Sequence, residues 1–152
     1  MEKQYFDTLY LTGITLPHKT TNTGGKAMED ISELWQEFEK GGWFAKIPER
    51  MENNVYAVYH NYEGDHTQPY AFFIGCRVTP GAPVPEGMEN VVIPAGDFVK
   101  FTAKGKIPDC IGSTWQKIWN SDVLRAYKAD FEVYDERSQD FNNAEVDIYI
   151  GV

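Results

Sequence analysis

The fold is decided by two short segments near the end of the chain, Asp130-Phe131-Glu132-Val133-Tyr134 and Glu145-Val146-Asp147-Ile148-Tyr149-Ile150. In both segments apolar and polar side chains alternate with the period of two that is typical of a β-strand. The period places the two apolar residues of the first segment on one face, and Glu132 and Tyr134 on the other. Two such strands, close together in the chain, predict an antiparallel pair.

The elements before these strands follow an order that also occurs in the first half of the chain. A strand predicted from Val91 to Ala103 is followed by a helix whose apolar side chains recur at steps of three and four. The first half has a predicted strand from Lys3 to Leu16, then an amphipathic helix and a strand pair. The apolar stripes of the two helices are Met28, Ile31, Leu34, Trp35 and Phe38, and Trp115, Ile118, Trp119 and Val123.

This repeated order predicts an α+β fold in which two pseudo-symmetric strand-helix-strand-strand half-domains form an antiparallel sheet with a central ligand groove. A chain of 152 residues, 42% of them hydrophobic, is expected to form a single domain over residues 1–152. We expect half-repeats at about 1–79 and 88–152. The linker between them, at about 80–87, lies in a stretch rich in proline and glycine that suits neither a central strand nor a helix.

Composition argues against several classes of function. The formal net charge is −9 and no run is rich in lysine or arginine, so we expect no direct nucleic-acid partner. The two cysteines and three histidines match no metal-ligand spacing, so neither a metal nor a cofactor is expected. No apolar run suits a membrane span or a secretory signal, and we therefore expect a cytoplasmic protein without a membrane partner.

The polar faces of the two strands are the first candidate for a site. If the strands form a hairpin, one side of the sheet would carry Glu132, Tyr134, Glu145, Asp147 and Tyr149. The alternation by itself is more typical of a solvated outer face, because antiparallel sheets commonly have one face in water. The pattern alone therefore does not define a binding site.

Longer stretches of the chain add a family pattern to this local one. The sequence resembles the AraC-type effector-binding, or gyrase-inhibitor-like, family over nearly its whole length. The matching stretches are Gly112 to Trp119, Phe131 to Asp135, Ala144 to Ile150, Val55 to Tyr59, Tyr70 to Gly75, and Ile93 to Phe98.

The resemblance implies a central pocket that binds drug-like or regulatory small molecules. It makes Glu132 the signature ligand group, and it places Glu145 where drug-binding relatives have a second carboxylate. Asp147 stands where those relatives can carry an aromatic residue, which is a departure from the family pattern.

A glutamate inside an apolar pocket favours a cationic ligand. Burial penalises the charged form and raises the pKa of a carboxyl group, and a bound organic cation would restore the balance of charge. Aromatic rings attract cations through their negative faces, and the candidate walls are Tyr59, Trp115, Trp119 and Tyr134. Core packing alone is the more typical explanation for the two tryptophans, although they could serve both the core and the pocket. Tyr59 and Tyr56 lie on opposite faces of one strand, so only one of them can line the groove, and Tyr59 is preferred.

The leading hypothesis is a stand-alone sensor or sequestering protein for an aromatic, lipophilic cation. No length of chain is left for a helix-turn-helix region, so a regulatory output would require another protein. No residue is assigned as catalytic, and no metal ligand is assigned. The predicted ligand-binding residues are Glu132, Tyr134, Glu145, Trp115, Trp119, Tyr59 and Asp147.

Two alternatives remain open. The first is a hydrolase of small reactive electrophiles, in which Glu132 would activate water and Tyr134 would assist. The second is a protein-binding inhibitor of the gyrase-inhibitor type, with an acidic surface that resembles nucleic-acid charge.

Overall fold

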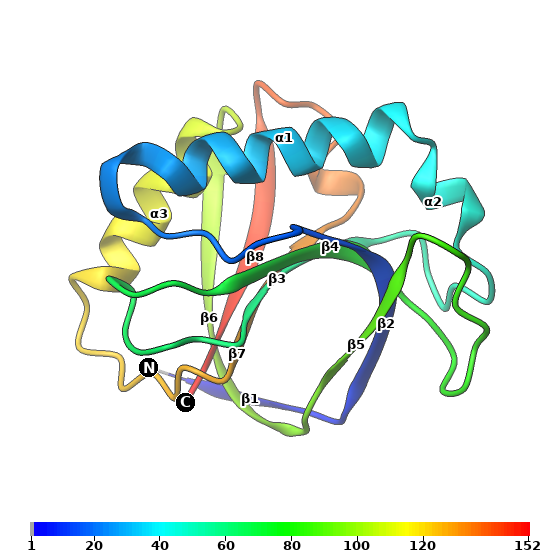
Figure 1. The fold of residues 1–152 in the computed structure, drawn as a ribbon. Coiled ribbons are helices and arrows are strands. Elements are labelled where there is room, and N and C mark those ends of the chain that lie inside the picture. Colours follow the sequence, from blue (N-terminus) through cyan, green and yellow to red (C-terminus); the bar gives the residue numbers. More distant parts are fainter. Residues whose placement is uncertain (1) are drawn as a thin grey trace.

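A computed structural model describes residues 2–152 and contains eight β-strands in one antiparallel sheet (Figure 1). Across the sheet the order is β1-β6-β8-β7-β3-β4-β2-β5. The strands are β1 (Lys3–Phe6), β2 (Leu9–Thr15), β3 (Val55–His60), β4 (Ala71–Arg77), β5 (Glu89–Ile93), β6 (Gly96–Gly105), β7 (Ala129–Tyr134) and β8 (Ala144–Gly151). The helices are α1 (Lys26–Lys40), α2 (Trp43–Lys46) and α3 (Asp109–Trp119), with single 3₁₀ turns at Thr23–Gly25 and Glu136–Ser138. The predicted α+β class and antiparallel sheet are confirmed.

Two segments predicted as single strands are each two strands. The segment from Lys3 to Leu16 divides into β1 and β2, and the segment from Val91 to Ala103 divides into β5 and β6 at Pro94-Ala95. Proline has no N–H to donate, so it interrupts the ladder of hydrogen bonds at that point. The four pieces then pair across the molecule, β1 with β6 and β5 with β2. The two predictions of unbroken strands were therefore wrong. The pairing could not be predicted either, because local alternation identifies a strand but not its partner.

The order of elements is the same in the two parts of the chain, β2-α1-β3-β4 and then β6-α3-β7-β8. The two sets of strands meet where β3 pairs with β7, over the register from Val55 opposite Tyr134 to His60 opposite Ala129. This seam lies in the middle of the sheet. Residues on its two strands are therefore the best placed to build one site from both parts of the chain.

Both faces of the sheet are covered. Helices α1 and α3 lie on one face, and the sheet curls away from them (Figure 1). Leu34 and Ile118 of these helices belong to the same buried cluster as Ala57 and Ile148 of the sheet. The opposite face holds an aromatic cluster in which Phe6, the last residue of β1, contacts Phe131 with ring centroids 5.4 Å apart. The seam is thus buried from both sides, and the picture of a solvated outer face does not apply to it.

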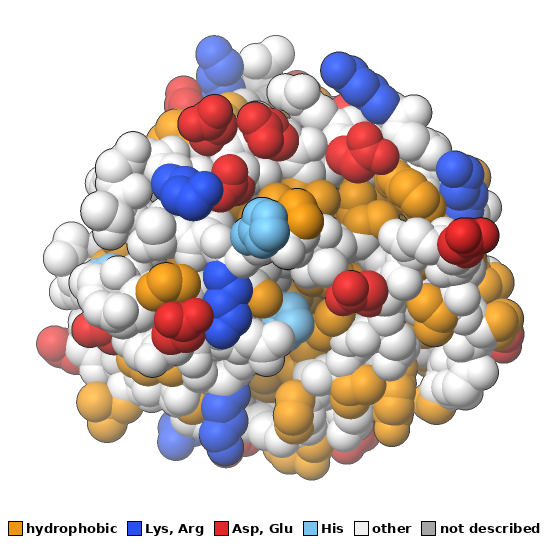
Figure 2. Space-filling view, in the orientation of Figure 1, with side chains coloured by type: hydrophobic (Ala, Val, Ile, Leu, Met, Phe, Trp, Pro, Cys, Tyr) orange, Lys and Arg blue, Asp and Glu red, His pale blue; other side chains and the backbone are white. Residues whose placement is uncertain are grey.

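Helix α1 is amphipathic as predicted, and its buried residues include Leu34 and Phe38. Met28, which we placed on the apolar stripe, is instead 77% exposed, although Ala27 in the same first turn is buried. The stripe that faces the sheet passes through Ala27, Leu34 and Phe38 and leaves Met28 to one side. Acidic side chains gather over this helix on the face that Figure 2 shows. No helix within residues 2–152 is long and apolar enough to cross a membrane.

Strands β2 and β4 approach closely at a pair of facing glycines, Gly13 and Gly75. A Cβ atom added at Gly13 would overlap the carbonyl oxygen of Ile74, and one added at Gly75 would overlap that of Thr12. Backbone atoms cannot move aside as a flexible side chain can. The close approach therefore requires glycine at both positions.

We predict that Gly13→Ala lowers the free energy of unfolding by about 1–3 kcal/mol, the usual cost of overpacking. Urea denaturation followed by circular dichroism measures this effect. The matched control is Gly112→Ala in α3, where an added Cβ meets no atom within 4 Å and should stabilise the helix by about 0.5–1 kcal/mol. Equal stability of Gly13→Ala and the wild type would contradict the close approach.

Candidate functional site

Glu132 is the buried charge at the centre of the sheet. It lies on β7 opposite Ala57 of β3 on one side and Ile148 of β8 on the other. Its side chain faces α1 and α3, because its neighbours in the ladder, Ala57 and Ile148, belong to the cluster beneath these helices. Only 1% of the residue is exposed. A carboxyl group in this position loses nearly all contact with water, so its partners decide how it is stabilised.

Three aromatic side chains donate hydrogen bonds to this carboxylate. The Tyr59 hydroxyl and the Trp115 indole Nε1 donate to Oε2 over 2.8 Å and 2.7 Å, and the Tyr134 hydroxyl donates to Oε1 over 2.7 Å. The donors come from β3, α3 and β7. The rings of Tyr59 and Trp115 also contact each other, with centroids 4.9 Å apart. The structure therefore brings together four of the predicted site residues.

Burial raises the pKa of Glu132, and the three hydrogen bonds lower it by less than burial raises it. Burial and the nearby carboxylate also raise the pKa of Tyr59 and of Tyr134 well above the ordinary value for tyrosine. Both phenols therefore remain protonated and act as donors at neutral pH. No lysine or arginine within residues 2–152 forms an ion pair with Glu132.

Trp35 is a further aromatic neighbour that the sequence analysis did not assign to the site. Its ring, on α1, meets that of Tyr134 edge to face with centroids 4.8 Å apart. The helical period had placed Trp35 on the apolar stripe, which is correct but does not show which residue of the sheet it covers. Through this contact α1, like α3, packs against the aromatic residues around Glu132.

Glu145 and Asp147 lie on the opposite face of the sheet from Glu132. The register sets Glu132 opposite Ile148, so the alternating period turns both acidic residues of β8 away from it. They pair instead with Arg137, whose Nη1 lies 2.9 Å from Glu145 Oε2 and whose Nη2 lies 2.7 Å from Asp147 Oδ2. The expectation that these carboxylates share one face with Glu132 and Tyr134 was wrong.

Trp119 does not contact Glu132 in this structure. It follows Trp115 by one turn on α3 and stacks on His66, with ring centroids 5.2 Å apart and planes 13° from parallel. It also packs against the cluster under the helices. The helix face on which both tryptophans lie was predicted correctly, but only Trp115 reaches the carboxylate.

Asp130 is a second buried carboxylate that the sequence analysis did not assign. It precedes Glu132 by two residues on β7, so it faces the same side of the sheet. Unlike Glu132 it has a cation of the chain as partner, because Arg125 Nη2 lies 2.7 Å from Asp130 Oδ2. The alternation that identified Glu132 could have identified Asp130 as well.

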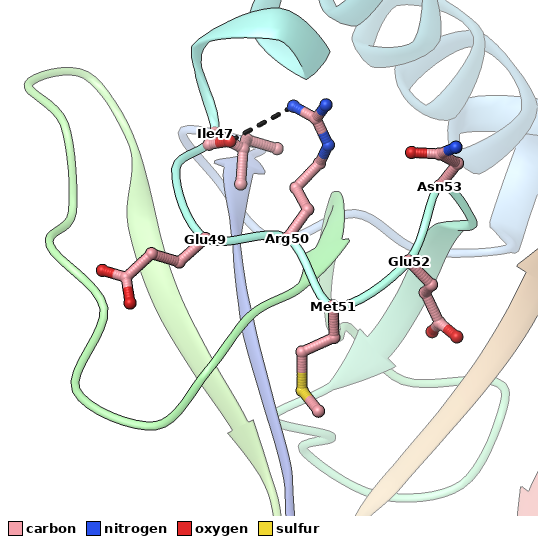
Figure 3. Close-up of a pocket in the computed structure, with 6 residues that line it drawn as sticks. All are labelled: Ile47, Glu49, Arg50, Met51, Glu52 and Asn53. Carbon is pink, nitrogen blue, oxygen red and sulfur yellow. Dashed lines mark hydrogen bonds between the residues drawn. The ribbon is translucent and has the colours of Figure 1, made fainter.

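A surface hollow of about 520 Å³ lies away from these residues. It is formed by the segment between α2 and β3, with the lining residues Ile47, Glu49, Arg50, Met51, Glu52 and Asn53 (Figure 3). Arg50 is turned back onto its own segment, where its Nη1 donates to the carbonyl oxygens of Phe44 and Ile47 over 2.8 Å and 3.2 Å. The hollow contains none of the aromatic donors, so it is not the candidate site.

The comparison with protein families places this fold in the class of effector-binding proteins. The chain belongs to the family of integron-associated effector binding proteins (Cass2), whose model matches residues 7–152. Small-molecule binding is therefore the general function that this family supports.

One curated relative and two solved structures are similar to this chain. The putative transcriptional regulator protein YobU of Bacillus subtilis is 30% identical over 126 residues, which cover 80% of this chain and 79% of YobU. An integron cassette protein of Vibrio cholerae has a crystal structure with a TM-score of 0.73 and 26% identity, covering 99% and 94% of the two chains. The structure of SAV2435 bound to tetraphenylphosphonium has a TM-score of 0.78 at 16% identity, covering 99% and 92%, and this likeness shows the fold alone.

The raised pKa of Glu132 predicts a pH-dependent stability. Between its ordinary value of 4.5 and the higher value in the folded protein, the folded state binds more protons than the unfolded state. The stability contributed by Glu132 therefore falls as the pH rises through this range. We expect the free energy of unfolding of the wild type, minus that of Glu132→Gln, to decrease from pH 4.5 upward in urea titrations.

Asp135→Asn is the control for this measurement. Burial alone would raise the pKa of Asp135, but the hydrogen bonds and charge of Arg137 lower it below 3.8. Most of the corresponding change for Asp135 therefore takes place below pH 4.5, and its difference curve should be nearly flat above that pH. A flat curve for Glu132→Gln as well would contradict the effect of burial on Glu132.

Proposed function

We propose that this protein binds a lipophilic aromatic cation beside Glu132 and acts as a sensor or sequestering protein for it. The observation that supports this most strongly is a buried carboxylate whose hydrogen-bond partners are all neutral. The nearby Asp130 differs in having Arg125 as its counter-ion. Glu132 is therefore the carboxylate that an external cation can neutralise.

The chemistry around Glu132 suits an aromatic cation better than a small hydrated one. Tyr59, Trp115 and Tyr134 present rings around the carboxylate, and each favourable cation–π contact contributes about 0.5–2 kcal/mol. Apolar groups of the ligand add roughly 25 cal/mol for each Å² removed from water. A metal ion or a simple ammonium ion would lose its hydration shell here and find few other oxygen ligands.

A ligand that reaches the carboxylate must take the place of at least one aromatic donor, because Glu132 is only 1% exposed. A hydrogen bond from a neutral donor contributes about 0.5–1.5 kcal/mol net. An ionic contact in a site of low dielectric can offset this loss. Trp115 and Tyr134 would then serve as walls for the ligand rather than as donors to the glutamate.

The comparisons support the choice of ligand class without fixing the ligand. The family is one of effector-binding proteins, and the related fold of SAV2435 was solved with tetraphenylphosphonium. That molecule is a permanent cation enclosed by four aromatic rings, which is the chemistry proposed for the site around Glu132. It is therefore a suitable first probe.

We predict that tetraphenylphosphonium binds the wild-type protein saturably, and that Glu132→Gln weakens this binding at least about tenfold, equivalent to 1.4 kcal/mol. The change removes the charge but keeps the shape of the side chain. Isothermal titration calorimetry measures the affinity, and quenching of tryptophan fluorescence provides a second readout. Triphenylphosphine oxide, a neutral analogue, should bind both forms with similar affinity.

Glu145→Gln is the matched control, because it removes the same charge from the opposite face of the sheet. It should leave both affinities unchanged. Equal losses of the cation and the neutral analogue in Glu132→Gln would contradict an electrostatic role for this residue. If no cation binds at all, the proposal fails and the hydrolase alternative becomes the one to test.

A further inference from the structure

Asp130 is the second carboxylate on the helix-covered face of β7, and its own surroundings suit a cation. Its side chain has no exposed surface. The Tyr62 hydroxyl donates to Oδ2 over 2.5 Å, and the backbone N–H of Gly151 donates to Oδ1 over 2.8 Å. The remaining partner is Arg125, whose guanidinium supplies the positive charge.

Aromatic rings surround the guanidinium of Arg125. Its Cζ atom lies 4.3 Å from the centroid of the Tyr127 ring, and 5.6 Å from those of Tyr62 and Trp115. Only 4% of the Arg125 side chain is exposed. A carboxylate with three aromatic rings around one cation is the arrangement by which proteins bind organic cations.

Asp130 and the rings of Tyr62, Trp115 and Tyr127 form a cage around Arg125, but not all the donors of Arg125 find a partner there. Its Nε and Nη1 atoms are buried, and neither has a hydrogen-bond partner among residues 2–152. An unsatisfied buried donor is destabilising, more so where the group is charged. Removal of Arg125 alone would nevertheless leave Asp130 buried without a counter-ion, which is strongly destabilising. A cation that takes the place of Arg125 should therefore restore much of the lost stability.

The segment that carries Arg125 has no regular secondary structure. Residues 120–128 form neither helix nor strand. A backbone hydrogen bond of 2.8 Å from Ala126 N to Gly151 O ties the segment to β8, whereas Leu124 beside it is 86% exposed. Withdrawal of Arg125 would break its contacts with Asp130, Tyr62, Trp115 and Tyr127, and these are the contacts that the guanidinium group of a ligand would make in its place.

We propose that Asp130 and the rings of Tyr62, Trp115 and Tyr127 form a second cation site, which Arg125 fills in this structure and a guanidinium or amidinium group of a ligand can fill in its place. A planar cation of this kind matches what the cage already holds. A ligand could also satisfy, with its own groups or with water, the donors that Arg125 leaves without partners.

The second site adjoins the first but does not depend on it. Asp130 and Glu132 are about 7 Å apart along the strand. Trp115 takes part in both sites, because its Nε1 donates to Glu132 and its ring lies against the guanidinium of Arg125. A ligand with two cationic groups at that spacing could reach both carboxylates. Occupation of the Asp130 cage requires only that Arg125 be absent from it.

The test removes the resident side chain and supplies its head group in solution. Arg125→Ala should unfold at a lower temperature than the wild type, and ethylguanidinium at millimolar concentration should raise its midpoint saturably, because it binds only the folded state. Ethylurea, a neutral molecule of nearly the same shape, should have no such effect. The wild type should respond at least about tenfold more weakly, since the tethered Arg125 competes at a high effective concentration.

Two double variants identify the site. Arg125→Ala with Asp130→Asn should lose the response to ethylguanidinium, whereas Arg125→Ala with Glu132→Gln should keep it. The second result separates this inference from the proposed function, which requires Glu132. If the Arg125→Ala variant is unfolded in the absence of ligand, ethylguanidinium is titrated into it and refolding is measured by circular dichroism. No stabilisation or recovery, an equal effect of ethylurea, or an unchanged response in the Asp130→Asn background would overturn the proposal.

Discussion

The antiparallel pairing of β3 with β7 is the interaction on which the site depends, because it joins the two parts of the chain into one sheet. Its register sets Ala57 opposite Glu132, and Tyr59, two residues further along β3, projects to the same face. A shift of one residue would turn Glu132 into the aromatic cluster around Phe131 on the other face. The exchange of β1 and β5 between the two parts helps to hold this register, since each pairs with a strand of the other part.

Two carboxylates on one strand are stabilised in different ways. Asp130 has a cation of the chain as partner, whereas Glu132 has three neutral donors. Two negative charges about 7 Å apart repel strongly in a medium of low dielectric, and Arg125 reduces this repulsion by neutralising one of them. The pKa of Glu132 is raised mainly by burial, so this carboxylate is the one that gains most from a positive charge supplied from outside the chain.

The sequence predicts which side chains gather around Glu132 where a local period decides the outcome. Alternation on β7 and the helical stripe of α3, together with the family resemblance, brought Glu132, Tyr134 and Trp115 together. The period could not place Glu145, because it assigns faces within one strand but not the register between two. The connection between β7 and β8 contains a 3₁₀ turn and sets Ile148 opposite Glu132. Arg125 lies in an irregular segment without a period, so no sequence pattern indicated its contact with Asp130.

The two faces of the sheet differ in the contacts that their side chains make. On the face away from the helices, Phe6, Phe98, Phe131 and Tyr149 form a cluster of rings with centroids 4.9 to 5.5 Å apart. On the helix face, polar contacts join the strands to side chains from α3 and from the irregular segment that follows it. Because side chains alternate along each strand, groups on the helix face can exchange partners while the ring cluster stays intact. Under the proposed function, ligand exchange at the carboxylates would require only local rearrangement, and a bound ligand would stabilise the folded state as a whole.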